Sequence, residues 1–331
     1  MSGFPLIFVS ESDFEEEAMK EISLLSFAKI NLSIDVKGVM DTGMHEVDMV
    51  MQQISFHDDV NICYEENGNS KGSISIELST NRPYLPTDER NTAYKAAMLM
   101  IEKFGDRMPG GVIRIHVTKR IPVAAGMAGG SGNGAAVLHG INALWNLKLS
   151  LKELCLIGAE IGSDVPFCVM GQAKANYVLP KYIRKDRLAS SCARATGTGT
   201  YMEPVKGLNR FLVIAKPSIS VSTAQVYKGI DSCEIVERPD NDRLVSDLQN
   251  CNFEDLYINF VNVLEKYTLE AYPEVKKLKN IMSEFAAGPV TLMSGSGPTV
   301  FTVCNSIDKA KAVSSALRKM RYEAYWTRTT K

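Results

Sequence analysis

Two charged residues, Asp164 and Lys29, have the side chains and surroundings that phosphoryl transfer requires. Asp164 lies between a helix stop at Gly162 and a proline at position 166, and its carboxylate can accept the proton of a hydroxyl group that attacks phosphorus. An ammonium group at Lys29 can keep this carboxylate ionised and neutralise charge that grows on the transferred group. A turn or N-cap role for Asp164 explains the same local sequence equally well.

A glycine-rich segment, residues 121–136, runs directly into a helical pattern of apolar residues that includes Val137 and Ile141. Glycine lets the backbone approach a ligand closely, and the free N–H groups of a helix N-terminus attract anions. Ser131 or Asn133 is the expected N-cap of this helix. The segment therefore predicts a phosphate-binding loop rather than a flexible linker.

Three better-known glycine motifs do not fit this segment. A P-loop needs a Gly-Lys dipeptide, and protein kinases need His-Arg-Asp and Asp-Phe-Gly; the chain contains none of these. The spacing from Gly130 to Ala135 resembles a dinucleotide fingerprint, but Pro122 and several loop residues separate it from the strand predicted at 112–117. We therefore predict a phosphate cradle of another type.

A second small-residue turn, Ser294-Gly295-Ser296-Gly297-Pro298, lies between two apolar strand patterns. It is either a wide hairpin turn or a second set of backbone N–H and hydroxyl groups at a phosphate site. Both interpretations stay open at this point.

Composition and charge exclude several classes of function. The formal net charge is −1, and no basic stripe is present that could bind nucleic acid. A solvated loop is the expected role of the basic cluster formed by Lys181, Arg184, Lys185, Arg187 and Arg194. No apolar run approaches the roughly 20 residues of a membrane span, so no membrane association is expected.

The cysteines and the acidic start of the chain point to the cytoplasm. The seven cysteines show no CxxC spacing and the four histidines show no metal-ligand spacing, which favours a reducing compartment without a zinc site or a disulfide framework. The first residues are acidic, unlike a signal peptide, and we predict a partly disordered tail over residues 1–21.

Periodicity predicts alternating strands and helices, and hence an α+β fold. Around Lys29, the apolar residues Ala28 and Ile30 fall on one strand face and the polar residues on the other. Strands are predicted at 23–40, 47–55, 61–64, 73–78, 112–117, 211–215, 289–293, 299–304 and 324–327. Helices are predicted at 91–104, 137–145, 150–161, 223–228, 253–263, 275–285 and 309–320. The length suits two domains, and we expect two α+β layers packed side by side.

Four motifs in order carry a resemblance to a known family: the strand at 28–32, the Pro-x-x-x-Gly-Met-x-Gly-Gly-Ser loop from Pro122, the segment 162–167 and the turn at 294–298. The sequence resembles the GHMP small-molecule kinases over residues 26–327. The resemblance implies an N-terminal domain like ribosomal protein S5 domain 2 (22–177) and a ferredoxin-like C-terminal domain (178–331), with a basic insertion at about 178–195. It also implies ATP and Mg²⁺ as cofactors and an active site between the domains.

The resemblance also assigns roles to individual residues. On the family pattern Asp164 is the catalytic base and Lys29 its cationic neighbour. The positions that match nucleotide-binding residues are Pro122, Gly126, Ala128, Gly129, Gly130, Ser131, Gly132, Asn133, Asn91 and Lys119, and Ser131 also matches the place of a hydroxyl near Mg²⁺. Those that match the acceptor pocket are Asn31, Met44, His45, Met51, Thr223, Tyr227, Ser294 and Gly295.

Within the family the resemblance is strongest to enzymes that phosphorylate the 2-hydroxyl of 4-diphosphocytidyl-2-C-methyl-D-erythritol, an isoprenoid precursor of the non-mevalonate pathway. It implies a small-molecule partner and a monomer or homodimer. Two methionines depart from the pattern, because Met44 and Met51 stand where aromatic rings sandwich the cytosine. The alternatives are a related kinase for an alcohol without cytosine and a nucleotide-binding homologue without catalysis.

Overall fold

The computed structural model describes residues 20–67 and 71–331, so the tail predicted at 1–21 lies almost entirely outside the described residues. The first sheet contains Glu21–Val39 (β1), His45–Glu66 (β2), Ile74–Thr80 (β3), Gly111–Thr118 (β4), Cys192–Gly197 (β5) and Tyr201–Pro204 (β6). Its order is β3-β4-β2-β5-β6, with β1 paired to β2. The β3–β4 pair is parallel, and the other pairs of this sheet are antiparallel.

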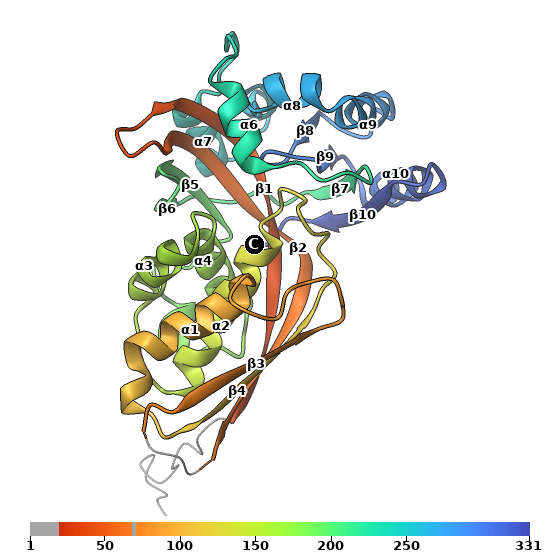
Figure 1. The fold of residues 1–331 in the computed structure, drawn as a ribbon. Helices are drawn as coiled ribbons and strands as arrows, with labels where there is room; N and C mark the ends of the chain where they lie inside the picture. The colour runs from red at the N-terminus through yellow and green to blue at the C-terminus, as the bar shows by residue number, and fades with distance from the viewer. Residues whose placement is uncertain (1–19, 68–70) are drawn as a thin grey trace, which may run out of the picture.

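Helices cover one face of this sheet in the lower half of Figure 1. They are Thr92–Phe104 (α1), Gly129–Leu144 (α2), Leu151–Ile161 (α3), Val165–Ala175 (α4) and Lys181–Arg184 (α5), with a 3₁₀ turn at Gly105–Arg107 (η1). Sequence signals set two of the starts: Asn91 accepts a hydrogen bond from Ala93 N before α1, and Ser150 and Glu153 form a capping box before α3. The helices and the sheet enclose one apolar core, to which Ile62, Ile115 and Leu138 belong.

The second sheet lies in the upper half and is antiparallel, in the order β10-β7-β9-β8. Its strands are Phe211–Lys216 (β7), Val290–Met293 (β8), Val300–Cys304 (β9) and Glu323–Arg328 (β10). The accompanying helices are Thr223–Ile230 (α6), Asn241–Asn250 (α7), Glu265–Ala271 (α8), Pro273–Glu284 (α9) and Ile307–Lys319 (α10), with a 3₁₀ turn at Leu256–Asn259 (η2).

The long strands β1 and β2 connect the two halves, as Figure 1 shows. A second core places Met51 of β2 and Phe167 of α4 with Val213 and Val300 of the upper sheet. Burial of these apolar side chains between elements from both halves fixes the halves against each other. The α+β prediction is confirmed.

Strand β2 is longer than its sequence pattern predicts. We expect separate strands at 47–55 and 61–64, whereas the structure has one strand, which pairs with β1 from His45 to Cys63 and with β4 from Asp59 to Glu66. The acidic pair Asp58 and Asp59 interrupts the alternation, but Asp58 is completely buried and finds partners within the fold. A tertiary contact therefore overrides the local signal.

The helix predictions also miss parts of the chain. The sequence does not predict helix α4, because its residues are buried on nearly all sides and therefore show no amphipathic period. Helices α7 and α8 were not expected either. The helix predicted at 253–263 is wrong, since only η2 forms there. Val261 and Val263 instead exchange backbone hydrogen bonds with Ile34 of β1.

The division between the two sheets differs from the domain boundary expected at residue 178. Strands β5 and β6 lie beyond that boundary but complete the first sheet, because β5 pairs with β2 from Val47 to Gln52. The sheets are thus divided between Pro204 and Phe211. The basic residue Arg194 lies on β5 and pairs with Asp48, so part of the expected basic insertion is strand rather than solvated loop.

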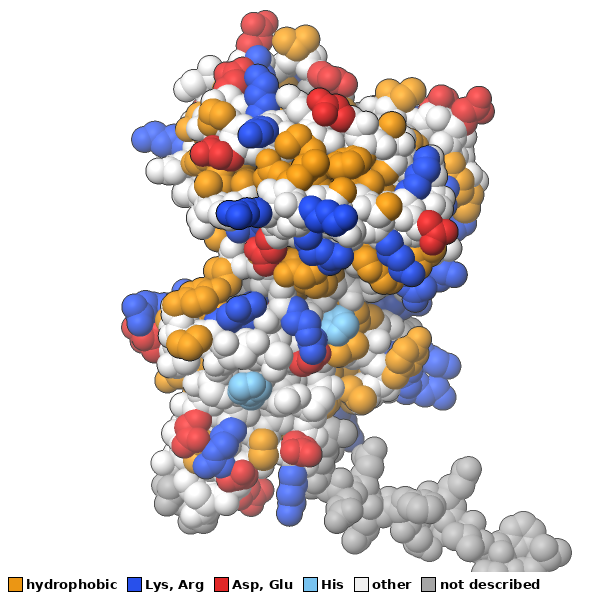
Figure 2. Space-filling model, turned by 90° about the vertical axis from the view of Figure 1, so that its right-hand side faces the viewer, with side chains coloured by type: hydrophobic (Ala, Val, Ile, Leu, Met, Phe, Trp, Pro, Cys, Tyr) orange, Lys and Arg blue, Asp and Glu red, His pale blue; other side chains and the backbone are white. Residues whose placement is uncertain are grey.

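The surface carries both signs of charge. Figure 2 shows several Lys and Arg side chains near the waist of one face, with acidic side chains both there and elsewhere on this face, and the molecule narrows between its halves. Within residues 20–67 and 71–331, helices are all too short or too polar to cross a bilayer.

Candidate active site

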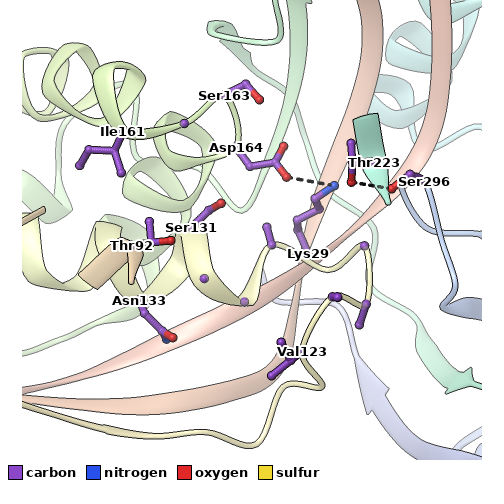
Figure 3. A pocket seen from close by; sticks show the side chains of 18 of the residues that line it. Lys29, Thr92, Val123, Ser131, Asn133, Ile161, Ser163, Asp164, Thr223 and Ser296 are labelled. Atoms are coloured by element: carbon purple, nitrogen blue, oxygen red, sulfur yellow. Dashed lines mark hydrogen bonds and ion pairs between the residues drawn. The ribbon is translucent and has the colours of Figure 1, made fainter. Parts of the chain in front are cut away.

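A cleft of about 860 Å³ opens between the two halves of the molecule. We distinguish two ends. The loop end comprises residues 119–133 with the turn at 294–297, and the hairpin end comprises Met44, His45, Thr223 and Tyr227 around the tip of the β1–β2 hairpin and the start of α6. Lys29 and Asp164 lie between them (Figure 3).

The side chains of Lys29 and Asp164 meet in this cleft. Lys29 Nζ lies 3.6 Å from Asp164 Oδ2, as Figure 3 shows. The same Nζ donates to Asn31 Oδ1 at 2.6 Å. The Lys29 side chain is 5% exposed, whereas that of Asp164 is 30% exposed, so the carboxylate is the member that a small molecule can reach. The family resemblance implies that the two residues are neighbours, and the structure places them within 3.6 Å of each other.

Asp164 is the residue before α4, but it does not cap that helix with its side chain. Pro166 lies in the first turn and removes one of the N–H groups that a cap would satisfy. The carboxylate therefore pairs with Lys29 and faces the cleft instead of capping the helix. The N-cap interpretation is correct for the backbone position and wrong for the side chain.

Helix α2 begins earlier than the sequence predicts. Its N-cap is Ala128, with φ at 55°, and no side-chain hydrogen bond closes its first turn. Ser131 and Asn133 lie inside the helix, so the prediction that either is the N-cap is wrong. Gly129 and Gly130 occupy the first helical positions and line the cleft. Helix N–H groups without a side-chain acceptor are a binding site for an anion.

The two glycine-rich segments pack against each other through their backbones. Gly126 has φ at +71°, and a Cβ atom there would overlap the carbonyl oxygen of Ser294 and lie 2.8 Å from that of Gly297. Ser294 Oγ also donates to the carbonyl oxygen of Gly126 at 3.0 Å. Ser294 is fully buried and supports the loop from behind, whereas Gly295 lines the cleft. Close backbone packing is the physical reason for glycine here.

A buried polar cluster lies beneath the loop end. Lys119 Nζ donates to Asp58 Oδ2 and, at 3.0 Å, to Asn133 Oδ1. Asn133 Nδ2 donates to Asp58 Oδ2 at 3.0 Å and to Ser26 Oγ at 2.9 Å. Lys119 and Asn133 reach the cleft, as predicted from the motif. Sequence reasoning missed Asp58, although a carboxylate inside a strand-forming run was the available signal.

At the hairpin end, two side chains contact the ring of His45: Tyr227 of α6 and Asp231, the residue that follows α6. The His45 ring lies 5.0 Å from the ring of Tyr227, and its Nε2 shares a 2.7 Å hydrogen bond with Asp231 Oδ1. A carboxylate accepts, so Nε2 carries the proton. Thr223 Oγ1 bonds to Ser296 Oγ at 2.9 Å (Figure 3). Burial raises the pKa of the Tyr227 phenol, and the charge of Asp164 adds to this, so the phenol stays protonated.

Three predicted site residues do not line the cleft: Ser294, which lies buried behind the loop, Met51 and Gly132. Met51 is fully buried and packs in the second core with Phe167, because it lies deeper than Met49 along the same strand face. Met49 lines the cleft instead, and Asn31 Nδ2 donates to its sulfur at 3.3 Å. Gly132 faces the opposite way, and its Cβ position lies 2.6 Å from Ser26 Oγ. The prediction of Met51 as an acceptor contact is thereby corrected.

The remaining predicted positions come together in the cleft, from segments far apart in the sequence. They are Asn31, Met44, His45, Asn91, Lys119, Pro122, Gly126, Ala128, Gly129, Gly130, Ser131, Asn133, Thr223, Tyr227 and Gly295. Within the described residues no group of three or more His, Cys, Asp or Glu side chains is arranged to hold a metal ion. A metal here would need oxygen atoms from a bound ligand as well as from the protein.

Comparisons with known proteins agree with this geometry. Residues 91–172 match the model of the GHMP kinases N terminal domain, and residues 244–323 match that of the GHMP kinases C terminal domain. A 4-diphosphocytidyl-2-C-methyl-D-erythritol kinase of Alkaliphilus metalliredigens is 41% identical over 89% of this chain and 91% of its own length. One of Bacillus licheniformis is 43% identical over 91% and 94%.

Solved structures give the same result. A crystal structure of 4-(cytidine 5'-diphospho)-2C-methyl-D-erythritol kinase superposes with a TM-score of 0.72 at 26% identity, and the match covers 94% of this chain and 100% of that one. A homoserine kinase from Cytophaga hutchinsonii shares the fold, with a TM-score of 0.66 at 17% identity over 98% of this chain and 97% of its own. The chain belongs to the GHMP kinases.

Proposed function

We propose that this protein transfers the γ-phosphoryl group of ATP to the 2-hydroxyl of 4-diphosphocytidyl-2-C-methyl-D-erythritol. The relatives that match nearly the whole chain carry the name of this kinase. The observation that carries the chemistry is the Lys29–Asp164 pair, placed beside a helix N-terminus that no side chain caps.

Asp164 acts as the base in this proposal. The acceptor hydroxyl lies against the partly exposed carboxylate, gives up its proton to Asp164 and attacks the terminal phosphorus, while the bond between this phosphorus and the bridging oxygen breaks and ADP leaves. Lys29 keeps Asp164 ionised and faces the charge that develops on the transferred group. Asn31 fixes the ammonium of Lys29 by its 2.6 Å hydrogen bond, so the lysine does not swing away from the reacting atoms.

The loop end binds the phosphates. The N–H groups of Gly129, Gly130 and Ser131 open the first turn of α2 toward the cleft, and the helix dipole favours negative charge there. Asn91 lines the same end and is held by Ala93 N and by the carbonyl oxygen of Pro86. The donors fit a triphosphate, which needs closely spaced N–H groups and a nearby cation.

The residues also fit Mg²⁺ in the way that ATP-dependent enzymes use it. Mg²⁺ keeps several waters and takes its other ligands from phosphates and from one or two protein oxygens. The Ser131 hydroxyl and the carboxylate of Asp164 both line the cleft and can supply such oxygens. Bound there, the metal would neutralise phosphate charge during transfer.

The hairpin end binds the acceptor. Tyr227 offers a ring face, His45 beside it offers a polar edge, and together they suit a planar base that carries hydrogen-bonding groups. Met44 stands where a second ring would complete a sandwich, and its side chain is half exposed. This methionine supports a second candidate function, phosphorylation of an alcohol that lacks cytosine.

We further propose a cytoplasmic enzyme that acts as a monomer or homodimer. ATP is the phosphoryl donor in this proposal and is a cytoplasmic metabolite. All seven cysteines of the chain are free thiols in the structure, which suits a reducing compartment.

Transfer of labelled phosphate tests the proposed function. The protein is incubated with labelled ATP, Mg²⁺ and the diphosphocytidyl acceptor, and Asp164→Asn is assayed beside it. We expect labelled product from the wild type and a loss of about a thousandfold in kcat for the variant, because a positioned base supplies this order of rate.

A matched control, Asp308→Asn, alters an exposed acidic residue of α10 far along the chain and should keep full activity. Equal label transfer by wild type and Asp164→Asn would contradict the role of the base. Turnover of other alcohols but not of the cytidyl compound would favour the second candidate.

A further inference from the structure

A completely buried carboxylate, Asp58, lies under the loop end without lining the cleft. Asp58 Oδ1 accepts from the backbone N–H groups of Arg120 at 2.6 Å and Ile121 at 2.8 Å. Asp58 Oδ2 accepts from Lys119 Nζ and from Asn133 Nδ2. Four donors thus converge on one side chain, and three of them come from consecutive residues where β4 ends.

These donors belong to the two segments that shape the loop end. Residues 119–121 lead from β4 into the glycine-rich loop, and Asn133 lies just over one turn into α2. The start of the loop and the start of the helix are therefore fixed to the same carboxylate. Any displacement of one against the other breaks hydrogen bonds to Asp58 and leaves oxygen atoms of this buried carboxylate unsatisfied, which costs free energy.

Asp58 also fixes where the charge of Lys119 lies. The Lys119 side chain is 7% exposed, and its Nζ lies 3.1 Å from the Cβ position of Gly129, the first residue of α2. A buried ammonium needs a counter-charge. With Asp58 as that partner, the ammonium stays beneath the uncapped turn, where it adds positive potential at the place that would take a phosphate.

We propose that Asp58 is a positioning residue for nucleotide binding. It acts through Lys119, Asn133 and the backbone of residues 120–121, and it touches no ligand itself. The proposal rests on the proposed function in one respect, that the loop end binds the phosphates of ATP. We expect its effect at the loop end alone, because the hydrogen bonds and the ion pair of Asp58, Lys119 and Asn133 involve no residue of the hairpin end.

Variants of three residues test this role. Asp58→Asn keeps the shape but loses the counter-charge and places an amide N–H₂ against the ammonium of Lys119. Ser26→Ala removes only the outermost contact, the acceptor for Asn133 Nδ2. Asp59→Asn is the matched control, since the neighbouring carboxylate is partly exposed and pairs with the Arg120 side chain on the surface.

The dissociation constant for ATP is measured by equilibrium titration, followed by KM for ATP and for the acceptor. We expect Asp58→Asn to weaken ATP binding about tenfold or more and Ser26→Ala about threefold, with the acceptor KM within about twofold of wild type. Asp59→Asn should bind ATP like the wild type. A general loss of structure would raise both KM values together.

Several outcomes would overturn the proposal. One is a folded Asp58→Asn protein that binds ATP as tightly as Asp59→Asn, and another is an equal rise in both KM values. If Asp58→Asn does not fold, unchanged ATP binding in Ser26→Ala overturns the proposal and weakened binding supports it. The titration needs no acceptor, so a wild type that binds ATP but phosphorylates nothing would remove the proposed function and leave this test intact.

Discussion

The loop end and the hairpin end of the cleft are built in different ways. At the loop end the shape comes from backbone, with Gly126 packed on the turn at 294–297 and Asp58 completely buried beneath. At the hairpin end the shape comes from side chains near solvent: Met44 is 52% exposed and the Asp231 side chain 41% exposed. Lys29 and Asp164, which lie between the ends, combine one buried and one partly exposed group.

The difference follows from what each end has to bind. A phosphate is recognised by N–H groups and positive charge, so the site must hold backbone atoms in place, which close packing and buried hydrogen bonds do. An acceptor alcohol is recognised by side chains that can differ without moving the fold. We therefore expect substitutions at the loop end to cost more than those at the hairpin end.

The largest effect is expected for Gly126→Ala. The new methyl group overlaps the carbonyl oxygen of Ser294 and forces a positive φ on alanine, which together cost about 4 kcal/mol. Urea unfolding should show the loss in the free energy of unfolding, and KM for ATP should rise. Gly197→Ala is the control, because Gly197 also has a positive φ but no atom lies within 4 Å of its Cβ position. Equal losses in the two variants would mean that backbone strain alone, not close packing, requires glycine at position 126.

A smaller effect is expected on the free energy of unfolding when the pH is lowered, and it arises from His139 of α2. Burial lowers the pKa of His139 to about 4, while its hydrogen bond to the carbonyl oxygen of Val169 in α4 opposes this shift. His139 therefore takes up a proton near pH 6.5 in the unfolded chain, but only near pH 4 in the folded protein. Stability is complete above the unfolded pKa and is lost as the pH falls toward the folded pKa. Between pH 7 and pH 5 the loss from this residue is about 2 kcal/mol.

Urea unfolding at the two pH values measures this contribution in the wild type and in His139→Gln, whose amide can keep the bond to Val169. Other groups titrate in both proteins, so the difference between the two pH dependences isolates His139. An identical pH dependence in both proteins would contradict the assignment.

The smallest effect is expected for Met44→Tyr, at the hairpin end. A ring opposite Tyr227 adds stacking to a base in the acceptor, and at an exposed position this is worth about 1 kcal/mol. KM for the cytidyl acceptor should fall about fivefold, with KM for ATP unchanged. Met40→Tyr is the control, since Met40 is a similarly exposed methionine near the hairpin tip that does not line the cleft. An unchanged acceptor KM in Met44→Tyr would show that no base lies against position 44.

The sequence by itself determined the chemistry-bearing residues and most of the elements that hold them. Glycines at 126, 129 and 130 imply close approach of a ligand or of another backbone, whatever the rest of the fold, because only glycine permits it without cost. Alternation around Lys29 marked a strand with one polar face, and the order of the motifs identified the family. These signals are local, so the chain carries them without its tertiary structure.

The tertiary structure alone decided which side chains share a space. In the sequence, Asp58 only interrupts a strand pattern. The structure explains this carboxylate, because Lys119 and Asn133 donate hydrogen bonds to it. Met51 fits the acceptor pattern by position, yet depth along β2 places it in the core and leaves Met49 at the cleft. Contacts between residues far apart in the chain depend on how strands and helices pack, and no periodicity records that packing. The meeting of Lys29 and Asp164, residues separated by more than a third of the chain, is of the same kind.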